Sequence, residues 1–117
     1  TGASVIGDSL KNTNFRGACL IGTNLTGSEL AGADMSGAIM GDTVLARLDL
    51  SKIKGLMNVS HRFTSIVDVT TLDATGRGIL SDQLRRLERQ LEIQGFLAKC
   101  GVPAPYLKFF ESVVLSD

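Results

Sequence analysis

The side chains that most often perform chemistry are few in this chain and lie far apart. His61 is the single histidine, and it is not close in sequence to either cysteine, Cys19 or Cys100, so no metal-binding motif is present. Serine and acidic residues occur throughout, but none forms a nucleophile elbow, a phosphate loop or a pair of carboxylates. We therefore expect no catalytic residue, no metal and no cofactor, with His61 a packed or surface residue and both cysteines reduced.

One cluster of basic residues needs a separate decision. Arg85, Arg86 and Arg89 stand close together, and Glu88 and Glu92 are interleaved with them. Mixed charges at helical spacing are typical of a solvated helix face, whereas a phosphate or nucleic-acid site needs an excess of positive charge. We predict a solvated face.

Composition and charge narrow the class of protein. Of the 117 residues, 44% are hydrophobic and 21% are charged, which is typical of a globular protein. Twelve basic residues balance twelve acidic ones. This balance argues against a nucleic-acid binder and against a strongly acidic mimic of DNA. No apolar run is long enough to span a membrane, and we expect a cytoplasmic protein.

The strongest pattern in the chain is a period of five residues. A large apolar residue recurs at every fifth position, and these residues are the predicted core: Val5, Leu10, Phe15, Leu20, Leu25, Leu30, Met35, Met40, Leu45 and Leu50. A small residue mostly stands two positions before each, and glycine often stands two positions after. Neither the helical period nor the alternation of a strand explains this spacing. A chain that turns a corner every five residues does, because large and small residues then point inward and glycine lies near the corner.

Repeats such as residues 23–27 (Thr-Asn-Leu-Thr-Gly) and 33–37 (Ala-Asp-Met-Ser-Gly) resemble those of the pentapeptide-repeat family. The resemblance covers residues 3–52 and implies a β-solenoid: a right-handed quadrilateral β-helix with four repeats per turn and about two and a half turns. Asp8 and Leu48 depart from the pattern, because each stands where a small residue is expected. We expect looser geometry at both ends of the array.

The pattern stops after Leu50, and the rest of the chain has a different organisation. We predict a β-helix over residues 1–57, an exit segment over 58–80 and a small α-helical C-terminal cap of two helices over 81–117. Within the exit segment, residues 64–72 are rich in Val, Ile and Thr and predict a short strand, and the two glycines of residues 74–78 predict a loop.

The first predicted helix begins at an N-cap, Ser81, and ends near residue 99, before Gly101 and Pro103. The second covers about residues 104–115. A leucine stripe follows the first helix at helical spacing: Leu84, Leu87 and Leu91, with Leu80 one turn earlier. This stripe either packs on the end of the solenoid or on the second helix, or forms the seam of a helix–helix dimer.

Scattered segments of the C-terminal half carry a second resemblance. Residues 41–43, 48–51, 54–56 and 96–103 look like a tail that follows pentapeptide repeats in some bacterial multidomain proteins. In those proteins the tail joins the repeats to an effector domain of the Toll/interleukin-receptor type. The resemblance implies that this chain is the scaffold part of a larger bacterial signalling or defence-type protein.

These observations predict a non-catalytic scaffold for protein–protein interaction or self-assembly. Solenoids need caps because their terminal turns expose apolar faces and unpaired strand edges, and no cap precedes residue 3. We therefore expect a protein partner, or a homo-oligomer formed through the C-terminal helices or the open end of the solenoid. The alternative is a protein that binds DNA gyrase, as some pentapeptide-repeat proteins do, but the short, neutral rod would give weak electrostatic steering.

Overall fold

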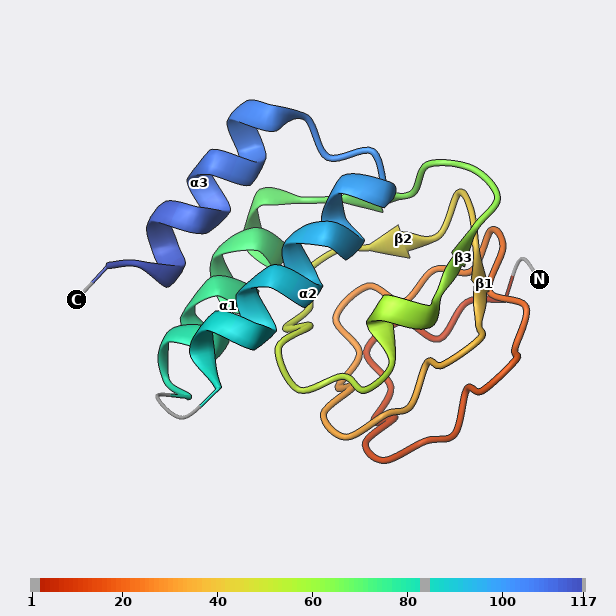
Figure 1. Ribbon diagram of the computed structural model, residues 1–117. Coiled ribbons are helices and arrows are strands. Elements are labelled where there is room, and N and C mark those ends of the chain that lie inside the picture. The colour runs from red at the N-terminus through yellow and green to blue at the C-terminus, as the bar shows by residue number, and fades with distance from the viewer. Residues whose placement is uncertain (1–2, 83–84, 117) are drawn as a thin grey trace.

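The computed structural model describes residues 3–82 and 85–116. A coil of stacked, nearly irregular backbone forms one side of the molecule and three helices form the other (Figure 1). The elements in chain order are β1 (Ile39–Met40), β2 (Val44–Leu45), the 3-10 helix η1 (Leu56–Asn58), β3 (Ser60–His61), β4 (Ile66–Val67), α1 (Val69–Leu80), α2 (Arg86–Lys99) and α3 (Ala104–Val114).

Parallel backbone pairing at a constant spacing holds the coil together. Ser4 pairs with Asn24, and Asn24 pairs in turn with Val44, so paired residues stand 20 positions apart. Four five-residue repeats therefore separate each residue from its partner in the next layer. Leu25, for example, donates its N–H to the carbonyl of Val44 at 3.0 Å. This pairing gives the β-helix-like fold that the period of five predicts.

The corners of the coil explain the position of glycine in each repeat. The N–H of Thr23 donates to the carbonyl of Leu20 at 3.1 Å, which closes a four-residue turn around Gly22. Gly22 has a φ of 71°, a left-handed conformation that glycine adopts without a steric penalty. Asn12 and Arg47 adopt the same conformation at corners without glycine, with φ of 60° and 54°.

The Asn or Asp before the large apolar residue has a local role. The Oδ1 atom of Asn24 accepts the N–H of Thr26 at 3.0 Å, and Asp34 accepts the N–H of Ser36 at 3.0 Å. Such Asx turns satisfy a backbone donor that points away from the next layer. The side chain therefore stabilises the corner from outside the coil.

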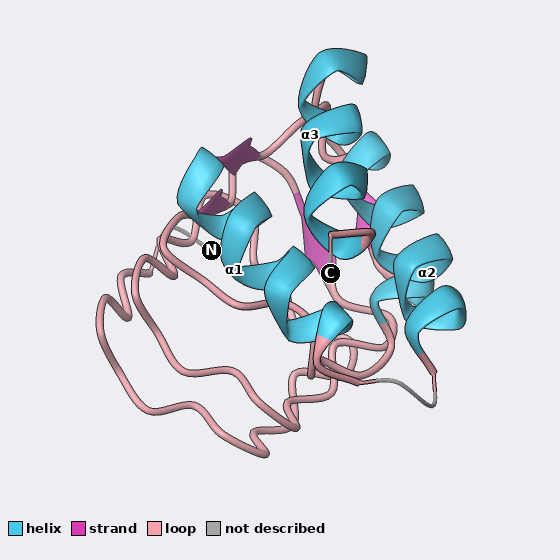
Figure 2. Ribbon diagram, turned by 90° about the vertical axis from the view of Figure 1, so that its left-hand side faces the viewer, coloured by secondary structure: helices cyan, strands magenta, loops and turns pink. Residues whose placement is uncertain are grey.

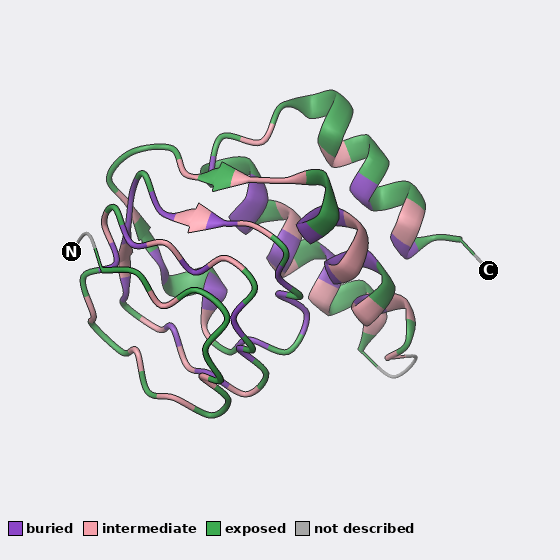
Figure 3. Ribbon diagram, turned by 180° about the vertical axis from the view of Figure 1, so that it is seen from behind, coloured by how far each residue is buried: buried purple, intermediate pink, exposed green. Residues whose placement is uncertain are grey.

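The predicted core residues fill the interior of the coil, as the buried segments in Figure 3 show. Seven of the ten are buried: Leu20, Leu25, Leu30, Met35, Met40, Leu45 and Leu50. Val5, Leu10 and Phe15, which belong to the first layer, are half-buried and pack against that core. Of the two positions that depart from the repeat, Asp8 is exposed, whereas Leu48 is fully buried.

Helix α1 closes the coil where the repeats end. The N–H groups of Leu48 and Leu50 donate to the side-chain hydroxyls of Thr71 at 3.1 Å and Thr75 at 2.9 Å. The Thr71 hydroxyl donates to the carbonyl of Leu45 at 2.8 Å. Asp68, the N-cap of α1, accepts the N–H of Arg47 at 3.2 Å. Side chains of α1 thus bind the backbone groups that another layer of the coil would otherwise pair.

Two predictions for the exit segment are wrong because of this helix. The strand predicted over residues 64–72 is limited to Ile66–Val67, and the loop predicted over 74–78 lies inside α1. Its two glycines serve close packing: a Cβ on Gly76 would lie 2.7 Å from a methyl of Val113, and one on Gly78 would lie 2.8 Å from the Cβ of Ser51. Tertiary contacts therefore outweigh the low helix propensity of this segment.

The cap consequently has three helices, which contact one another beside the coil (Figure 2). Ser81 is the C-cap of α1 rather than the N-cap of the next helix, and its hydroxyl donates to the carbonyl of Gly78 at 2.7 Å. Helix α2 begins at Arg86 and ends at Lys99, before Gly101, whose φ is 96°. The predicted end of this helix and the predicted helix over residues 104–115 are confirmed.

His61 is a packing residue at the contact between the coil and α2. Its ring centroid lies 5.2 Å from that of Phe96. Neither ring nitrogen has a hydrogen-bond partner within the described residues. Burial lowers the pKa of His61, and the nearby charge of Lys99 lowers it further. The ring is therefore neutral at pH 7, and its position favours packing over chemistry.

We predict that Thr75→Val lowers the free energy of unfolding by about 1–3 kcal/mol, because the variant leaves the buried N–H of Leu50 without an acceptor. The matched control is Thr70→Val on the exposed side of the same helix, which should change stability little. Urea unfolding measures both. Equal stabilities for the two variants would show that the Thr75 hydroxyl does not close the coil.

We also predict that the protein loses stability as the pH falls below about 6.5. The folded-state pKa of His61 is lowered, so the unfolded chain binds the proton more readily and acid favours unfolding. Melting temperatures between pH 7.5 and pH 5.0 measure this effect. His61 is the single histidine of the chain, so His61→Leu should flatten the profile in this range. An unchanged slope in the variant would contradict the assignment.

Candidate interaction surfaces

Helix α2 turns its leucine stripe to solvent. Leu87 and Leu91 are 69% and 65% exposed, and the side of the helix that faces the interior carries Ile93, Phe96 and Leu97 instead. The predicted packing of these leucines on the solenoid or on the last helix is therefore wrong for Leu87 and Leu91. Leu84 lies outside the described residues.

The orientation of α2 follows from one arginine on its inner side. The guanidinium of Arg89 donates to the carbonyl of Ser51 at 3.1 Å and to that of Ile53 at 2.9 Å, both in the coil. It also forms a 2.7 Å ion pair with Glu92, in which both side chains are mostly buried. The prediction of a solvated arginine face is wrong for Arg89, because the open edge of the coil offers it backbone acceptors.

Arg85 behaves as predicted and lies in solvent. It forms a 3.2 Å ion pair with Glu88, and both side chains are more than two-thirds exposed. Such an exposed pair contributes little to stability. Arg85 therefore leaves Glu88 accessible to a second partner.

The exposed side chains next to α2 form one continuous surface, which we call the α2 surface. It consists of Leu87, Leu91 and Gly95 on α2 and of Met57 on η1, which is 69% exposed. A hollow of about 600 Å³ lies between η1 and the N-terminal half of α2, and Met57, Glu88 and Leu91 line it. A second hollow of about 130 Å³ lies nearer the other end of α2, beside Gly95 and Lys99. Charged groups thus border an apolar centre at both ends.

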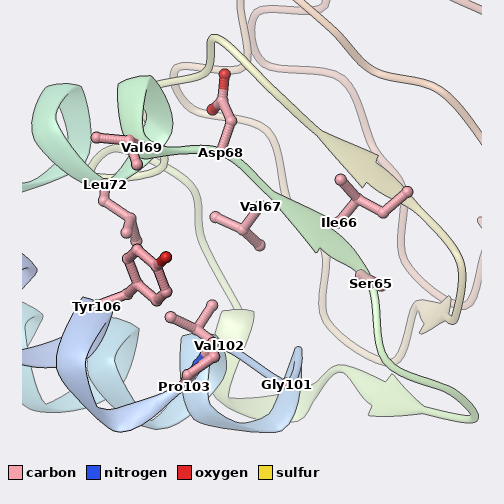
Figure 4. Close-up of a pocket in the computed structure, with 10 residues that line it drawn as sticks. All are labelled: Ser65, Ile66, Val67, Asp68, Val69, Leu72, Gly101, Val102, Pro103 and Tyr106. Carbon is pink, nitrogen blue, oxygen red and sulfur yellow. The ribbon is translucent and has the colours of Figure 1, made fainter.

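A second apolar hollow lies where the coil meets α1 and α3, and we call it the junction groove (Figure 4). Its volume is about 490 Å³. Val67, Val102 and Tyr106 surround its centre, whereas the carboxylate of Asp68 points away. Burial alone would raise the pKa of Asp68, but hydrogen bonds from Thr71 and Arg47 lower it, so its charge is held by the N-terminus of α1.

The remaining reactive side chains are not brought together. Cys19 is exposed on the coil, and Cys100 is buried beneath α2, where burial raises the pKa of its thiol to about 12. Within residues 3–82 and 85–116, no group of three or more His, Cys, Asp or Glu side chains could hold a metal ion. None of the helices described in this range is long and apolar enough to cross a membrane.

Sequence reasoning identified part of the α2 surface and missed the rest. Leu87 and Leu91 stood out by their spacing. Met57 and Gly95 carried no signal, because their positions beside the leucines depend on how η1 and α2 pack. The junction groove combines segments that are distant in the sequence, so no local pattern predicts it.

Comparisons with known proteins agree with the geometry of the coil. Residues 9–52 match the family model described as pentapeptide repeats, in eight copies. No curated protein matches the chain. The match ends at residue 52, so the resemblance of the C-terminal segments to a linking tail stays a prediction. The layers spaced 20 residues apart and the matched residues coincide, and the N-terminal coil of this protein is therefore built from pentapeptide repeats.

Proposed function

We propose that this chain is a non-catalytic scaffold that self-assembles through the α2 surface and thereby positions a domain attached to it. The observation that carries the proposal is the exposure of Leu87, Leu91 and Met57 on neighbouring elements. Contiguous apolar side chains with a charged border are typical of protein–protein interfaces. The tail resemblance supports the role of an attached effector domain, and with it a bacterial, cytoplasmic protein.

The proposal includes the full form of the coil. We infer a right-handed quadrilateral β-helix of about two and a half turns, in which each repeat forms one face. The spacing of 20 residues between paired positions supports four repeats per turn. The turns at Gly22, Gly27 and Gly37, with φ between 70° and 73°, support a corner in each repeat. A rigid body of this kind suits a part that holds other parts in place.

The open end of the coil is the competing surface for self-assembly. The apolar residues of its first layer, Val5, Leu10 and Phe15, are half-buried rather than buried. Ile6 lies on the same layer and is 57% exposed. The α2 surface has the larger exposed side chains and two hollows beside them, so we favour it.

We predict that the protein is a dimer at high concentration and that Leu91→Glu makes it a monomer, because a charge would be buried at the centre of the interface. The matched control is Ile6→Glu, which places the same charge on an exposed apolar position of the coil. Light scattering measures the mass of each protein, and circular dichroism checks that the helices remain.

Two results would contradict the proposal. A wild-type protein that stays monomeric at the highest attainable concentration would exclude self-assembly. A dimer that survives Leu91→Glu but dissociates in Ile6→Glu would move the interface to the open end of the coil.

A further inference from the structure

Helix α2 contains a glycine that the fold of a single chain does not require. Gly95 lies in the interior of the helix and is exposed, and a Cβ built on it would meet no atom within 4 Å. Glycine weakens a helix relative to alanine. In α1, by contrast, Gly76 and Gly78 stand where a side chain would collide with Val113 and Ser51. No contact within the described chain accounts for Gly95 in this way.

The position of Gly95 relative to the leucines suggests its use. Leu87, Leu91 and Gly95 are spaced four residues apart, so they follow one another along the outer face of α2. Leu91 projects from this face, while Gly95 leaves a gap one turn further on. A protruding leucine beside a gap of this kind matches the knob and hole by which paired helices pack.

We propose that a second copy of this chain covers the α2 surface, with the two α2 helices antiparallel and Leu91 of each copy seated over the partner's Gly95. This inference rests on the self-assembly proposed above and specifies its partner and geometry. The interface is two-fold symmetric, so each copy supplies both the leucine and the gap.

The charges at the border of the surface favour this arrangement over a parallel one. Glu88 and Lys99 are both exposed and lie toward opposite ends of α2, and Lys99 makes no ion pair within the described residues. When residue 91 lies opposite the partner's Gly95, residue 88 lies opposite position 98 of the second helix. Glu88 then comes beside the partner's Lys99, and the symmetry repeats the pair. A parallel pairing would bring like charges together.

The same charges favour a second copy over an unrelated protein. An acidic group at one end and a basic group at the other make the border complementary to itself when one copy is reversed. The helix dipoles also oppose each other in the antiparallel pair, which is the favourable orientation. The surface therefore provides both halves of its own interface.

The first test uses Gly95→Ala, which should act with opposite signs on folding and on assembly. In the monomeric Leu91→Glu background, the added methyl meets nothing and should raise the melting temperature. In the otherwise wild-type chain it fills the gap, and the dimer dissociation constant should rise by about tenfold or more. Analytical ultracentrifugation measures the dissociation constant. A variant that dimerises as tightly as the wild type would overturn the proposal.

The second test reverses the charges. Glu88→Lys and Lys99→Glu should each weaken the dimer by roughly three- to tenfold, and the double variant should restore it, because only antiparallel pairing brings positions 88 and 99 together. Glu111→Lys and Lys108→Glu, at exposed positions on α3, are the matched controls and should not change the dissociation constant. Absence of rescue in the double variant would exclude this register.

Failure of this inference and failure of the proposed function give different results. A wild-type chain that remains monomeric overturns both. A wild-type dimer that requires Leu91, but tolerates Gly95→Ala and shows no charge rescue, leaves self-assembly standing and excludes the antiparallel geometry.

Discussion

The unpaired backbone at the end of the coil is the constraint that shapes the rest of this molecule. Inside the coil each layer pairs with the next, but the last repeats have no following layer on that side. Thr71 and Thr75 accept the free N–H groups, and Arg89 donates to the free carbonyls. Buried backbone groups without partners are costly, so these contacts fix where α1 and α2 lie. The exposed face of α2 follows directly from that placement.

The coil was predictable because each of its rules acts within one repeat. In the repeat around Leu25, the leucine fills the interior, Asn24 supports the corner and Gly27 allows the turn. Helix α1 was not predictable in the same way. Its threonines and glycines give a weak helical signal, and their use depends on contacts with Leu50 and Ser51, more than twenty residues earlier in the chain. Local propensity does not contain that information.

The candidate site was predictable only in part for a related reason. Helix α2 has two apolar stripes, one through Leu87 and Leu91 and the other through Ile93 and Phe96, and spacing alone does not tell which faces inward. The bonds of Arg89 to the coil decide the matter. Once the second stripe is buried, the leucines that looked like core residues become surface residues, and an interface becomes the simplest account of their exposure.

The regular spacing of the layers also affects how such a protein can change in length. The cap recognises one particular stretch of the coil, since the contacts of α1 and α2 are made with residues 45–53. Adding one repeat upstream would turn everything before it by a quarter of a turn relative to the helices, whereas adding 20 residues would restore the same bearing one layer higher. Duplication during evolution could thus set the direction in which a neighbouring domain points, in discrete steps, while the helical end of the molecule stays unchanged.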